Sequence, residues 1–309
     1  MLTTHIRPDC DALGSTLAMA EVLRRLGKSV EIVVGYEVPP NLAWIDSDHE
    51  IKQLGKDVLA EDLAEIEVIL VLDTSAWAQM SHIETFLRES SAKKVVIDHH
   101  VSSDELGAVM MKNDTAAATG ELVAEIVDFF GIEWDPKLAV PLYAAVATDT
   151  GWYRFPSVTG HTYRLAAEFL EGGAVPSEIY AKLYENETLA RLELIGRILA
   201  RATTELDGRL IYTWVELADF EQTGALPTDT EDVINMALSV GGTEGAVILV
   251  EQPDGRCKVS FRSRGKMHSA EVAERFGGGG HKAAAGAMVD GPLDVARQRV
   301  LDAVRTAMG

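Results

Sequence analysis

Two short apolar runs limit the folds that this chain can adopt. Residues 68–72 and 95–97 have the length of strands and contain no polar side chain. Strands of this kind are buried on both faces, which is typical of parallel sheets covered by helices on each side. Between such runs, the first half of the chain repeats a polar loop and an amphipathic helix. The sequence therefore predicts an α/β fold whose first domain is built on a largely parallel sheet.

The first half also contains helices with clear ends. One helix ends at Gly27, and its apolar stripe consists of Leu13, Leu17, Ala20, Leu23 and Leu26. Residues 30–34 are predicted to form the strand that follows it. A second helix is expected to begin near Thr115 or Thr119 and to end at Gly131.

The second half of the chain follows another pattern. Residues 176–206 are predicted to be helical and to join the two halves. The elements expected beyond them are strands at 210–215, 246–250 and 257–262 and helices at 230–238, 269–276 and 293–307. These elements predict a smaller mixed α/β domain. We therefore expect a first domain over 1–185, a helical linker over 186–206 and a second domain over 207–309.

Length, charge and cysteine content exclude several classes of protein. A chain of 309 residues exceeds what one compact core usually holds. A formal net charge of −20 argues against a broad basic surface for long duplex nucleic acid, whereas a short anionic ligand is compatible with it. Cys10 and Cys257 lie too far apart in sequence to suggest a disulfide framework or a zinc cluster. Without a recognisable signal or membrane-spanning segment, we expect a cytoplasmic protein with no membrane contact.

Acidic and histidine side chains occur where the predicted strands end. They are His5, Asp9 and Asp11 before the first helix, Asp73 after residues 68–72, and Asp98, His99 and His100 after residues 95–97. In an open parallel sheet, ligands bind beyond the carboxyl ends of the strands, so these groups are expected to converge. Crowded carboxylates repel one another unless a cation lies among them. Oxygen and imidazole ligands without thiolates favour manganese above magnesium, with zinc and cobalt left open.

These residues belong to motifs whose order resembles that of a known family. The motifs are His5-Ile-Arg-Pro-Asp9-Cys-Asp11-Ala-Leu-Gly14-Ser15, Asp73-Thr-Ser75, Asp98-His99-His100 and Thr148-Asp149-Thr150-Gly151. In this order they are similar to the four motifs of the DHH phosphoesterase superfamily. Two segments of the second half, Ser260-Phe-Arg262-Ser-Arg264 and Gly277-Gly-Gly-Gly-His281-Lys-Ala-Ala-Ala-Gly286, resemble the DHH-associated substrate domain, DHHA1. The chain looks most like the branch of oligoribonucleases and 3'-phosphoadenosine 5'-phosphate phosphatases called nanoRNases.

The resemblance implies a two-metal site in the first domain. The expected ligands are His5 and Asp9 for one ion, Asp11, His99 and Asp149 for the other, and Asp73 as a bridge between them. The resemblance also implies that His100 lies beside the scissile phosphate and that Asp98 orients an imidazole by accepting its second ring N–H. In the second domain it implies that the substrate contacts Arg262, Gly279, Gly280 and His281. There, small residues let the backbone approach a phosphate, and the two larger side chains donate to its oxygens.

Such a site suggests a hydrolytic mechanism. Two metal ions can lower the pKa of a bridging water and stabilise the entering and leaving oxygens at phosphorus. The resulting hypothesis is that a metal-bridged hydroxide cleaves phosphoester bonds in short oligoribonucleotides and in 3'-phosphoadenosine 5'-phosphate. The expected cofactors are two divalent ions, with Mn²⁺ preferred and Mg²⁺ or Co²⁺ allowed. The expected partners are short oligonucleotides or nucleotide bisphosphates, and a homodimer is compatible with the sequence.

Other functions are compatible with some of the same motifs. A phosphodiesterase for cyclic di-AMP or pApA shares the chemical motifs and differs only in substrate. A non-catalytic nucleotide-binding module would be expected to lose metal ligands first, and this chain has all of those expected. The segment 277–286 argues against a family II inorganic pyrophosphatase. Chain length and negative charge argue against a processive exonuclease, which needs a basic track for single strands.

Overall fold

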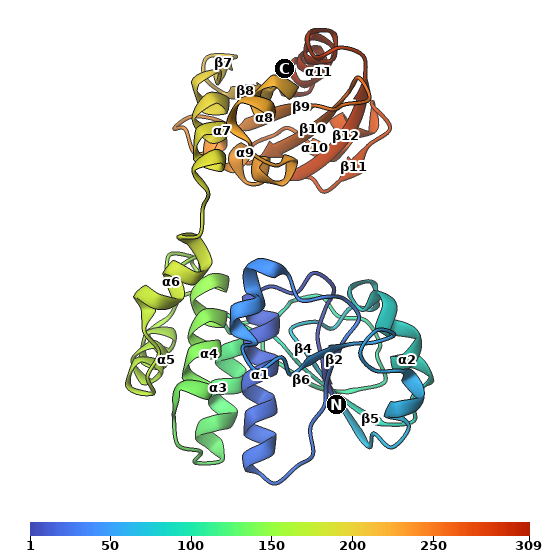
Figure 1. The fold of residues 1–309 in the computed structure, drawn as a ribbon, viewed down its shortest axis with the longest axis vertical. Helices are drawn as coiled ribbons and strands as arrows, with labels where there is room; N and C mark the ends of the chain where they lie inside the picture. Colours follow the sequence, from blue (N-terminus) through green and yellow to red (C-terminus); the bar gives the residue numbers. More distant parts are fainter. The chain divides into compact units, whose positions relative to one another are not determined.

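The computed structural model describes residues 1–309 apart from the side chain of Ser81. The chain divides into two compact units, Met1–Asn186 and Glu187–Gly309, which Figure 1 colours from blue to yellow-green and from yellow to red. Each unit contains one six-stranded sheet and its own helices. Within the described residues, no helix combines the length and the apolar character that a membrane crossing requires.

The first unit is built on a parallel sheet, as the two apolar runs predict. Its strands lie in the order β3-β2-β1-β4-β5-β6, and every neighbouring pair is parallel. In the β4–β5 pair, Leu70 lies opposite Val95 and Leu72 lies opposite Ile97. The strands are β1 (Leu2–Thr3), β2 (Ile32–Val34), β3 (Ile51–Gln53), β4 (Val68–Leu72), β5 (Lys93–Asp98) and β6 (Val109–Lys112).

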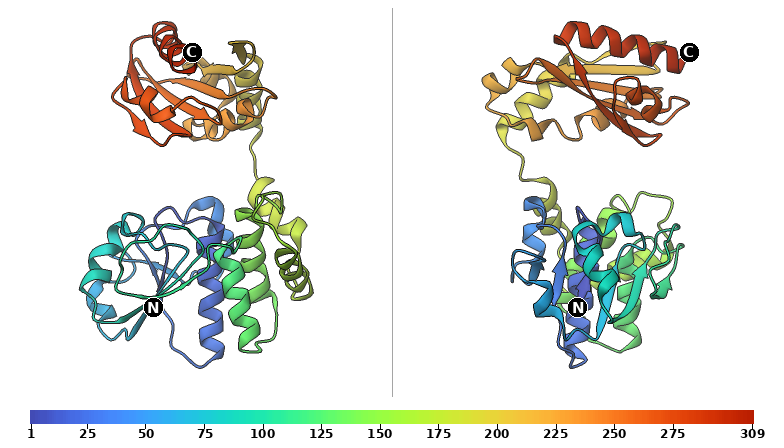
Figure 2. Two further views of the ribbon diagram at one scale, coloured as in Figure 1. Left: turned by 180° about the vertical axis from the view of Figure 1, so that it is seen from behind. Right: turned by 90° about the vertical axis from the view of Figure 1, so that its right-hand side faces the viewer.

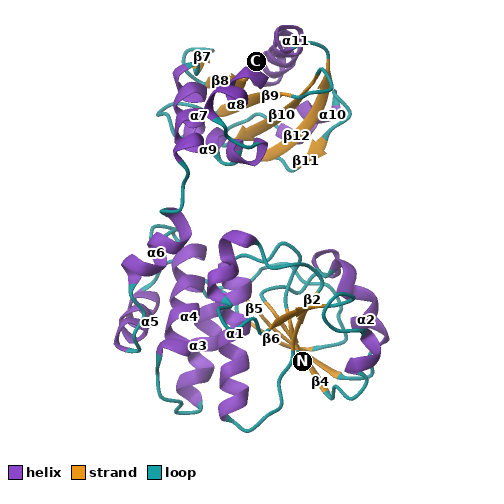
Figure 3. Ribbon diagram, viewed as in Figure 1, coloured by secondary structure: helices purple, strands orange, loops and turns teal.

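Helices cover both faces of this sheet. Leu72 of β4 packs in a core with α1, α3 and α4, whereas Ile69 and Val71 pack on the opposite face with α2. Figures 1 and 3 show α1, α3 and α4 side by side. The α-helices are α1 (Cys10–Arg25), α2 (Glu84–Glu89), α3 (Thr119–Phe129), α4 (Pro136–Asp149), α5 (Gly160–Glu171) and α6 (Pro176–Tyr184). The 3₁₀ turns are η1 (Pro40–Ile45), η2 (Ala60–Leu63), η3 (Trp77–Gln79) and η4 (Ser81–Ile83).

The second unit has a mixed sheet, as predicted. Its strands lie in the order β11-β12-β10-β9-β8-β7, in which only β8 and β9 are parallel among the described pairs. Helices α10 and α11 pack on one face, and α7 and α9 pack on the other. Figure 2 shows this unit from two further sides, with α11 in dark red next to the C-terminus. The strands are β7 (Thr203–Glu205), β8 (Leu210–Val215), β9 (Gly245–Glu251), β10 (Arg256–Ser263), β11 (Gly279–Gly280) and β12 (Ala284–Asp290). The helices are α7 (Leu189–Ala200), α8 (Leu217–Thr223), η5 (Pro227–Thr230), α9 (Val233–Leu238), α10 (Ser269–Glu274) and α11 (Leu293–Met308).

The prediction of one helical stretch over 176–206 is wrong in its continuity. The structure has two helices, α6 and α7, separated by residues 185–188, and β7 begins at Thr203. The break has two local causes. The Asn186 amide donates to the Lys182 carbonyl at 2.7 Å and closes the end of α6. The Thr188 hydroxyl accepts the Arg191 N–H at 3.1 Å and thereby caps the start of α7.

A buried ion pair ties α7 to α8 in the second unit. Asp219 is 1% exposed. Its carboxylate accepts from Arg201 Nη2 at 2.8 Å and from the Glu216 N–H at 2.8 Å. Burial alone would raise the pKa of Asp219, but these hydrogen bonds lower that pKa below its ordinary value. The pair therefore stabilises the fold above the pKa of an unfolded aspartate, about 3.9, and this contribution is lost as pH falls through the lower folded-state pKa.

We expect Asp219→Asn to lower the free energy of unfolding by about 2 kcal/mol at neutral pH, because the substitution removes the buried charge to which Arg201 donates. Urea denaturation at pH 7 and at about pH 3 would test this, since the difference from the parent protein should shrink in acid. Asp254→Asn is the matched control. Asp254 pairs with Arg256 at the surface, so its replacement should leave the urea midpoint unchanged. Equal losses of unfolding free energy in both variants would contradict a stabilising role of the Asp219–Arg201 pair.

Candidate metal centre

The predicted acidic and histidine residues come together at one edge of the parallel sheet. Three neighbouring strands supply part of the set: His5 follows β1, Asp73 follows β4, and Asp98 is the last residue of β5. His99 and His100 follow directly after Asp98. Because the strands are parallel, their carboxyl ends meet at the same edge, and the predicted convergence is observed.

Two helices supply the remaining carboxylates. Asp9 is the N-cap of α1 and accepts the Ala12 N–H at 3.0 Å, and Asp11 lies in the first turn. Asp149 is the last residue of α4, which packs along α1. The ligand atoms form three overlapping groups, each within 4.8 Å: His5, Asp9 and Asp73; Asp11, His99 and Asp149; and Asp73, His99 and His100. The structure thus brings together every residue that the sequence implies as a metal ligand, and their roles stay predictions.

The orientation of two imidazoles fits metal binding. Nδ1 of His5 lies 2.8 Å from the carbonyl oxygen of Ile6, and Nδ1 of His99 lies 3.3 Å from that of Ala116. Because a carbonyl oxygen only accepts, Nδ1 carries the proton in each of these hydrogen bonds. Nε2 is then the atom left to bind a cation, and it faces Asp73 at 3.3 Å from His5 and 3.6 Å from His99. Both rings are therefore oriented so that a divalent cation could replace the proton at Nε2.

The carboxylates of this cluster repel one another. Burial raises the pKa of Asp11 well above its ordinary value, and the charges of Asp73 and Asp149 add to the effect. Burial together with the charge of Asp73 raises the pKa of Asp149 to about 6. Burial alone would lower the pKa of His5, but its hydrogen bond to Asp73 and the nearby carboxylates raise that pKa to about 9. A divalent cation among these groups would compensate the negative charge, so the donor set fits a metal ion.

The first turn of α3 holds two of the carboxylates, a contact that the sequence analysis missed. The N–H groups of Thr119 and Gly120 donate to the two oxygens of Asp11 at 2.7 and 2.8 Å. The Thr119 hydroxyl donates to Asp73 Oδ1 at 2.9 Å. Unpaired N–H groups at the start of a helix favour an anion. The signal available in the sequence was the Thr-Gly pair at the predicted helix start. The structure explains the glycine, since an added Cβ at Gly120 would lie 2.9 Å from the Cβ of Ala145.

The backbone bends sharply at Asp73. Its φ is +61°, in the left-handed region that residues other than glycine seldom adopt and that clusters at functional sites. Its N–H donates to the Ile97 carbonyl at 2.9 Å, and the residue is 2% exposed. The bend thus turns the carboxylate out of the line of β4 and towards His5 and His99.

A hydrogen-bonded pair lies next to the cluster. Asp98 is 0% exposed; one of its oxygens accepts the His100 N–H at 3.0 Å and lies 2.8 Å from the His100 Nδ1. The Ser75 hydroxyl donates to its other oxygen at 2.6 Å. Burial alone would raise the pKa of Asp98, but these hydrogen bonds lower it to about 2, and the bond to Asp98 raises the pKa of His100. The half-exposed His100 lines a cavity of about 170 Å³ with His5, Asp9 and Asp73. Asp98 therefore orients the His100 ring.

The predicted substrate residues of the second unit lie on a hairpin and the adjacent strand. Arg262 on β10 is opposite Ala284 of β12, and Gly279 belongs to β11. The N–H of His281 donates to the Ala284 carbonyl at 2.7 Å in the turn between β11 and β12. Gly280 has φ +144°, and an added Cβ would lie 2.6 Å from the Ala284 oxygen, so the turn requires glycine there. Substrate contact by these residues stays a prediction.

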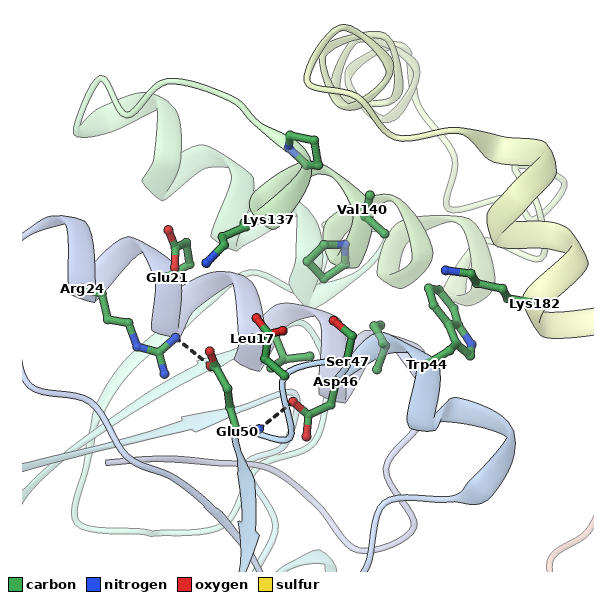
Figure 4. A pocket seen from close by; sticks show the side chains of 14 residues that line it. Leu17, Glu21, Arg24, Trp44, Asp46, Ser47, Glu50, Lys137, Val140 and Lys182 are labelled. Carbon is green, nitrogen blue, oxygen red and sulfur yellow. Dashed lines mark hydrogen bonds and ion pairs between the residues drawn. The ribbon is translucent and has the colours of Figure 1, made fainter.

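Another cavity in the first unit is lined by polar side chains that pair with one another. It has a volume of about 350 Å³ and is lined by α1, α4, α6 and the segment after η1 (Figure 4). Several of its polar groups bond to one another: Arg24 pairs with Glu50 at 2.7 Å, Asp46 accepts the Glu50 N–H at 2.9 Å, and Lys182 lies 5.2 Å from the centre of the Trp44 ring. The contact of Arg24 joins the segment after η1 to α1, and that of Lys182 joins η1 to α6. The cavity shares no lining residue with the one beside the metal cluster.

Comparisons with known proteins agree with this architecture. The model of the DHH family, N-terminal domain, matches residues 1–147, and that of the DHHA1 domain matches residues 207–309. The chain is 30% identical over 307 residues to the bifunctional oligoribonuclease and PAP phosphatase NrnA of Thermus thermophilus, covering 98% of this chain and 88% of that protein. It is 27% identical over 292 residues to the protein of the same name from Bacillus subtilis, covering 94% and 88%.

A solved structure extends the similarity to three dimensions. An exopolyphosphatase-related protein from Bacteroides fragilis matches with a TM-score of 0.82 and 26% identity, over 99% of this chain and 91% of its own. The match to the DHH model spans all the clustered carboxylates and imidazoles except Asp149, which lies two residues beyond its end. DHH phosphoesterases depend on metal ions, which agrees with the donor set described above. The chain therefore belongs to the DHH family and is a phosphoesterase that combines a DHH domain with a DHHA1 domain.

Proposed function

We propose that this phosphoesterase hydrolyses short oligoribonucleotides and 3'-phosphoadenosine 5'-phosphate. The observation that carries the proposal is the set of three overlapping donor groups at the carboxyl edge of the parallel sheet. The names of the relatives from Thermus thermophilus and Bacillus subtilis support the choice of substrates. Cytoplasmic location, pairing of two copies and exclusion of long duplexes are further predictions of the same hypothesis.

We propose that two divalent cations bind in the first unit, with Mn²⁺ preferred. One would be held by His5 and Asp9 and the other by Asp11, His99 and Asp149, with Asp73 serving both. The support is geometric, because Asp73 belongs to two of the donor groups and faces both histidines. When bound, such ions activate water and stabilise charge at phosphorus.

The side chains of the chain itself would orient the substrate. The His100 ring is fixed through Nδ1 by Asp98, so Nε2 is available for a hydrogen bond with a phosphate oxygen. In the second unit, Arg262 lines a cavity of about 300 Å³ together with Lys258 and Ser260. These three residues alternate along β10 and therefore share one face of the sheet. We propose that Arg262, together with His281 and the turn at Gly279 and Gly280, binds a phosphate group of the nucleotide substrate.

A comparison of substrates tests this function. With Mn²⁺, the purified protein is expected to release phosphate from 3'-phosphoadenosine 5'-phosphate and mononucleotides from a short RNA at least tenfold faster than it cleaves cyclic di-AMP or pyrophosphate. A chelator should abolish the reaction, and added Mn²⁺ should restore it. Preference for cyclic di-AMP would reassign the protein to the cyclic-dinucleotide phosphodiesterases. Hydrolysis of none of the four compounds would refute the proposal.

A further inference from the structure

We propose that Lys112 is a positioning residue that holds the Asp98–His100 pair in place for phosphoester hydrolysis. The inference rests on the proposed function and adds a residue that neither the motifs nor the sequence analysis assigns. Lys112 is the last residue of β6, and its side chain is 16% exposed. Its Nζ donates to the Ser102 carbonyl at 2.6 Å and to the Ser75 hydroxyl at 3.0 Å. The same atom lies 3.4 Å from Asp98 Oδ2.

The amine of Lys112 joins three segments that are separate in the sequence. Ser75 follows β4, Asp98 ends β5, and Ser102 lies in the loop after His100. An ammonium has three donors, and these three oxygens can use all of them. The Ser75 hydroxyl accepts from Lys112, and its own proton faces Asp98 Oδ2 at 2.6 Å and the Ser102 carbonyl at 2.9 Å. The charged carboxylate, at the shorter distance, is the stronger acceptor of the two. The Ser75 hydroxyl and the charge of Lys112 thus hold Oδ2, and Oδ1 is left for the N–H and the ring of His100.

The strand register places the positive charge of Lys112 next to the buried carboxylate of Asp98. Lys112 is paired with Asp98 in the parallel β5–β6 ladder. Asp98 is fully buried, and a buried carboxylate requires a nearby counter-charge or several hydrogen bonds. His100 is half exposed and is the side chain that would contact the substrate. Lys112 supplies compensating charge from the edge strand, so Asp98 can orient His100 while the other ring nitrogen stays available.

Lys112 also fixes the chain on the far side of His100. Its shortest hydrogen bond, to the Ser102 carbonyl, restrains the loop that begins directly after His100. Asp98 restrains the same histidine from the other side, through its N–H and its ring. Loss of the amine would therefore free both the carboxylate that orients the ring and the loop that follows it. The metal ligands themselves are not bonded to Lys112 in the described contacts.

Kinetics of Lys112→Met test the proposal, because methionine keeps the length of the side chain and removes the charge. We expect kcat on 3'-phosphoadenosine 5'-phosphate to fall about 10- to 100-fold, the usual effect of removing an outer partner, while KM stays within about threefold. Lys112→Arg should recover part of the loss. Lys94→Met is the matched control, because Lys94 donates to the Ser90 carbonyl before the other end of β5. Its kcat should equal that of the parent protein.

A second readout separates positioning from activity. In the metal-free protein, ¹⁵N NMR of the imidazoles should show the Nδ1–H of His100 bonded to Asp98, and this signal should shift or broaden in Lys112→Met but not in Lys94→Met. Mn²⁺ affinity measured by calorimetry should stay within threefold. A kcat within twofold of the parent, or a lower kcat with unchanged His100 signals, would overturn the proposal.

Two further outcomes remain informative. If Lys112→Met does not fold, Ser75→Ala tests the same link, since it removes one donor to Asp98 Oδ2 and keeps the lysine. A tenfold lower kcat with a shifted His100 signal would then support the inference, and unchanged values would refute it. If the parent protein hydrolyses none of the proposed substrates, the proposed function fails. The NMR comparison would still decide whether Lys112 holds His100.

Discussion

Asp73→Asn is expected to abolish phosphoester hydrolysis, with a loss of at least about 10³-fold in kcat/KM, equivalent to about 4 kcal/mol in the barrier. The two carboxylate oxygens of Asp73 face different histidines, His5 at 3.3 Å and His99 at 3.6 Å. An amide has the same shape but lacks the charge, and its nitrogen offers no lone pair to a cation. Both halves of the donor cluster should therefore lose affinity for Mn²⁺, which calorimetry and steady-state kinetics would measure together.

The fold is expected to survive this substitution. The charge of Asp73 is one cause of the raised pKa of Asp11, so its removal relieves repulsion in the metal-free protein. The substitution also removes the charge that pairs with His5, so the two effects oppose each other and the thermal midpoint of the metal-free variant should stay close to that of the parent. Asp48→Asn provides the matched control, because Asp48 is an exposed aspartate of the same unit. If Asp73→Asn kept more than a tenth of the parent activity while Asp48→Asn behaved normally, the central role of Asp73 would be wrong.

The sequence predicts the parallel sheet because burial on both faces leaves a visible pattern. The apolar runs 68–72 and 95–97 are followed by Asp73 and Asp98, and the structure has them in β4 and β5. The helix α4 could not be predicted in the same way. It is buried around most of its circumference, so its apolar residues show no helical period. Pro141 also argues against a helix in the sequence, although α4 continues through it. β12 could not be predicted either, because small residues such as Gly286 carry little of the periodic signal of a strand.

Topology alone predicts the part of the candidate site that lies at strand ends, whereas Asp149, at the end of α4, is expected only from the family resemblance. His5, Asp73 and Asp98 follow strands of one parallel sheet, so topology alone brings them together. The hydrogen bond from Thr119 to Asp11 spans 108 residues, and it depends on how α3 packs against α1. The bond from Lys112 depends on the register of an edge strand. Contacts of this kind follow from tertiary packing, which periodicity and spacing do not encode.

A second large effect is expected at Gly14, where α1 approaches α4. An added Cβ at Gly14 would lie 2.3 Å from the carbonyl oxygen of Pro141 and 3.1 Å from the Cβ of Ala145. The carbonyl belongs to the α4 backbone, so it cannot rotate away, and the two helices would have to separate. α1 carries Asp11 one turn before Gly14, and α4 ends at Asp149. Separation of the helices would therefore pull apart two carboxylates that belong to one donor group.

We accordingly expect Gly14→Ala to lower kcat/KM on the order of 10²-fold, the effect of a displacement of about 1 Å in a catalytic group. The free energy of unfolding should fall by about 1–3 kcal/mol through overpacking, although alanine is the better helix former. Gly196→Ala in α7 is the control, because an added Cβ there meets nothing within 4 Å. That variant should gain about 0.5–1 kcal/mol and keep full activity. If close packing of α1 on α4 sets the metal site, the urea midpoint should therefore fall in Gly14→Ala and rise in Gly196→Ala, and kcat/KM should fall in Gly14→Ala alone. Stabilisation by both substitutions would mean that α1 and α4 can accommodate a methyl group at position 14, which would contradict the prediction.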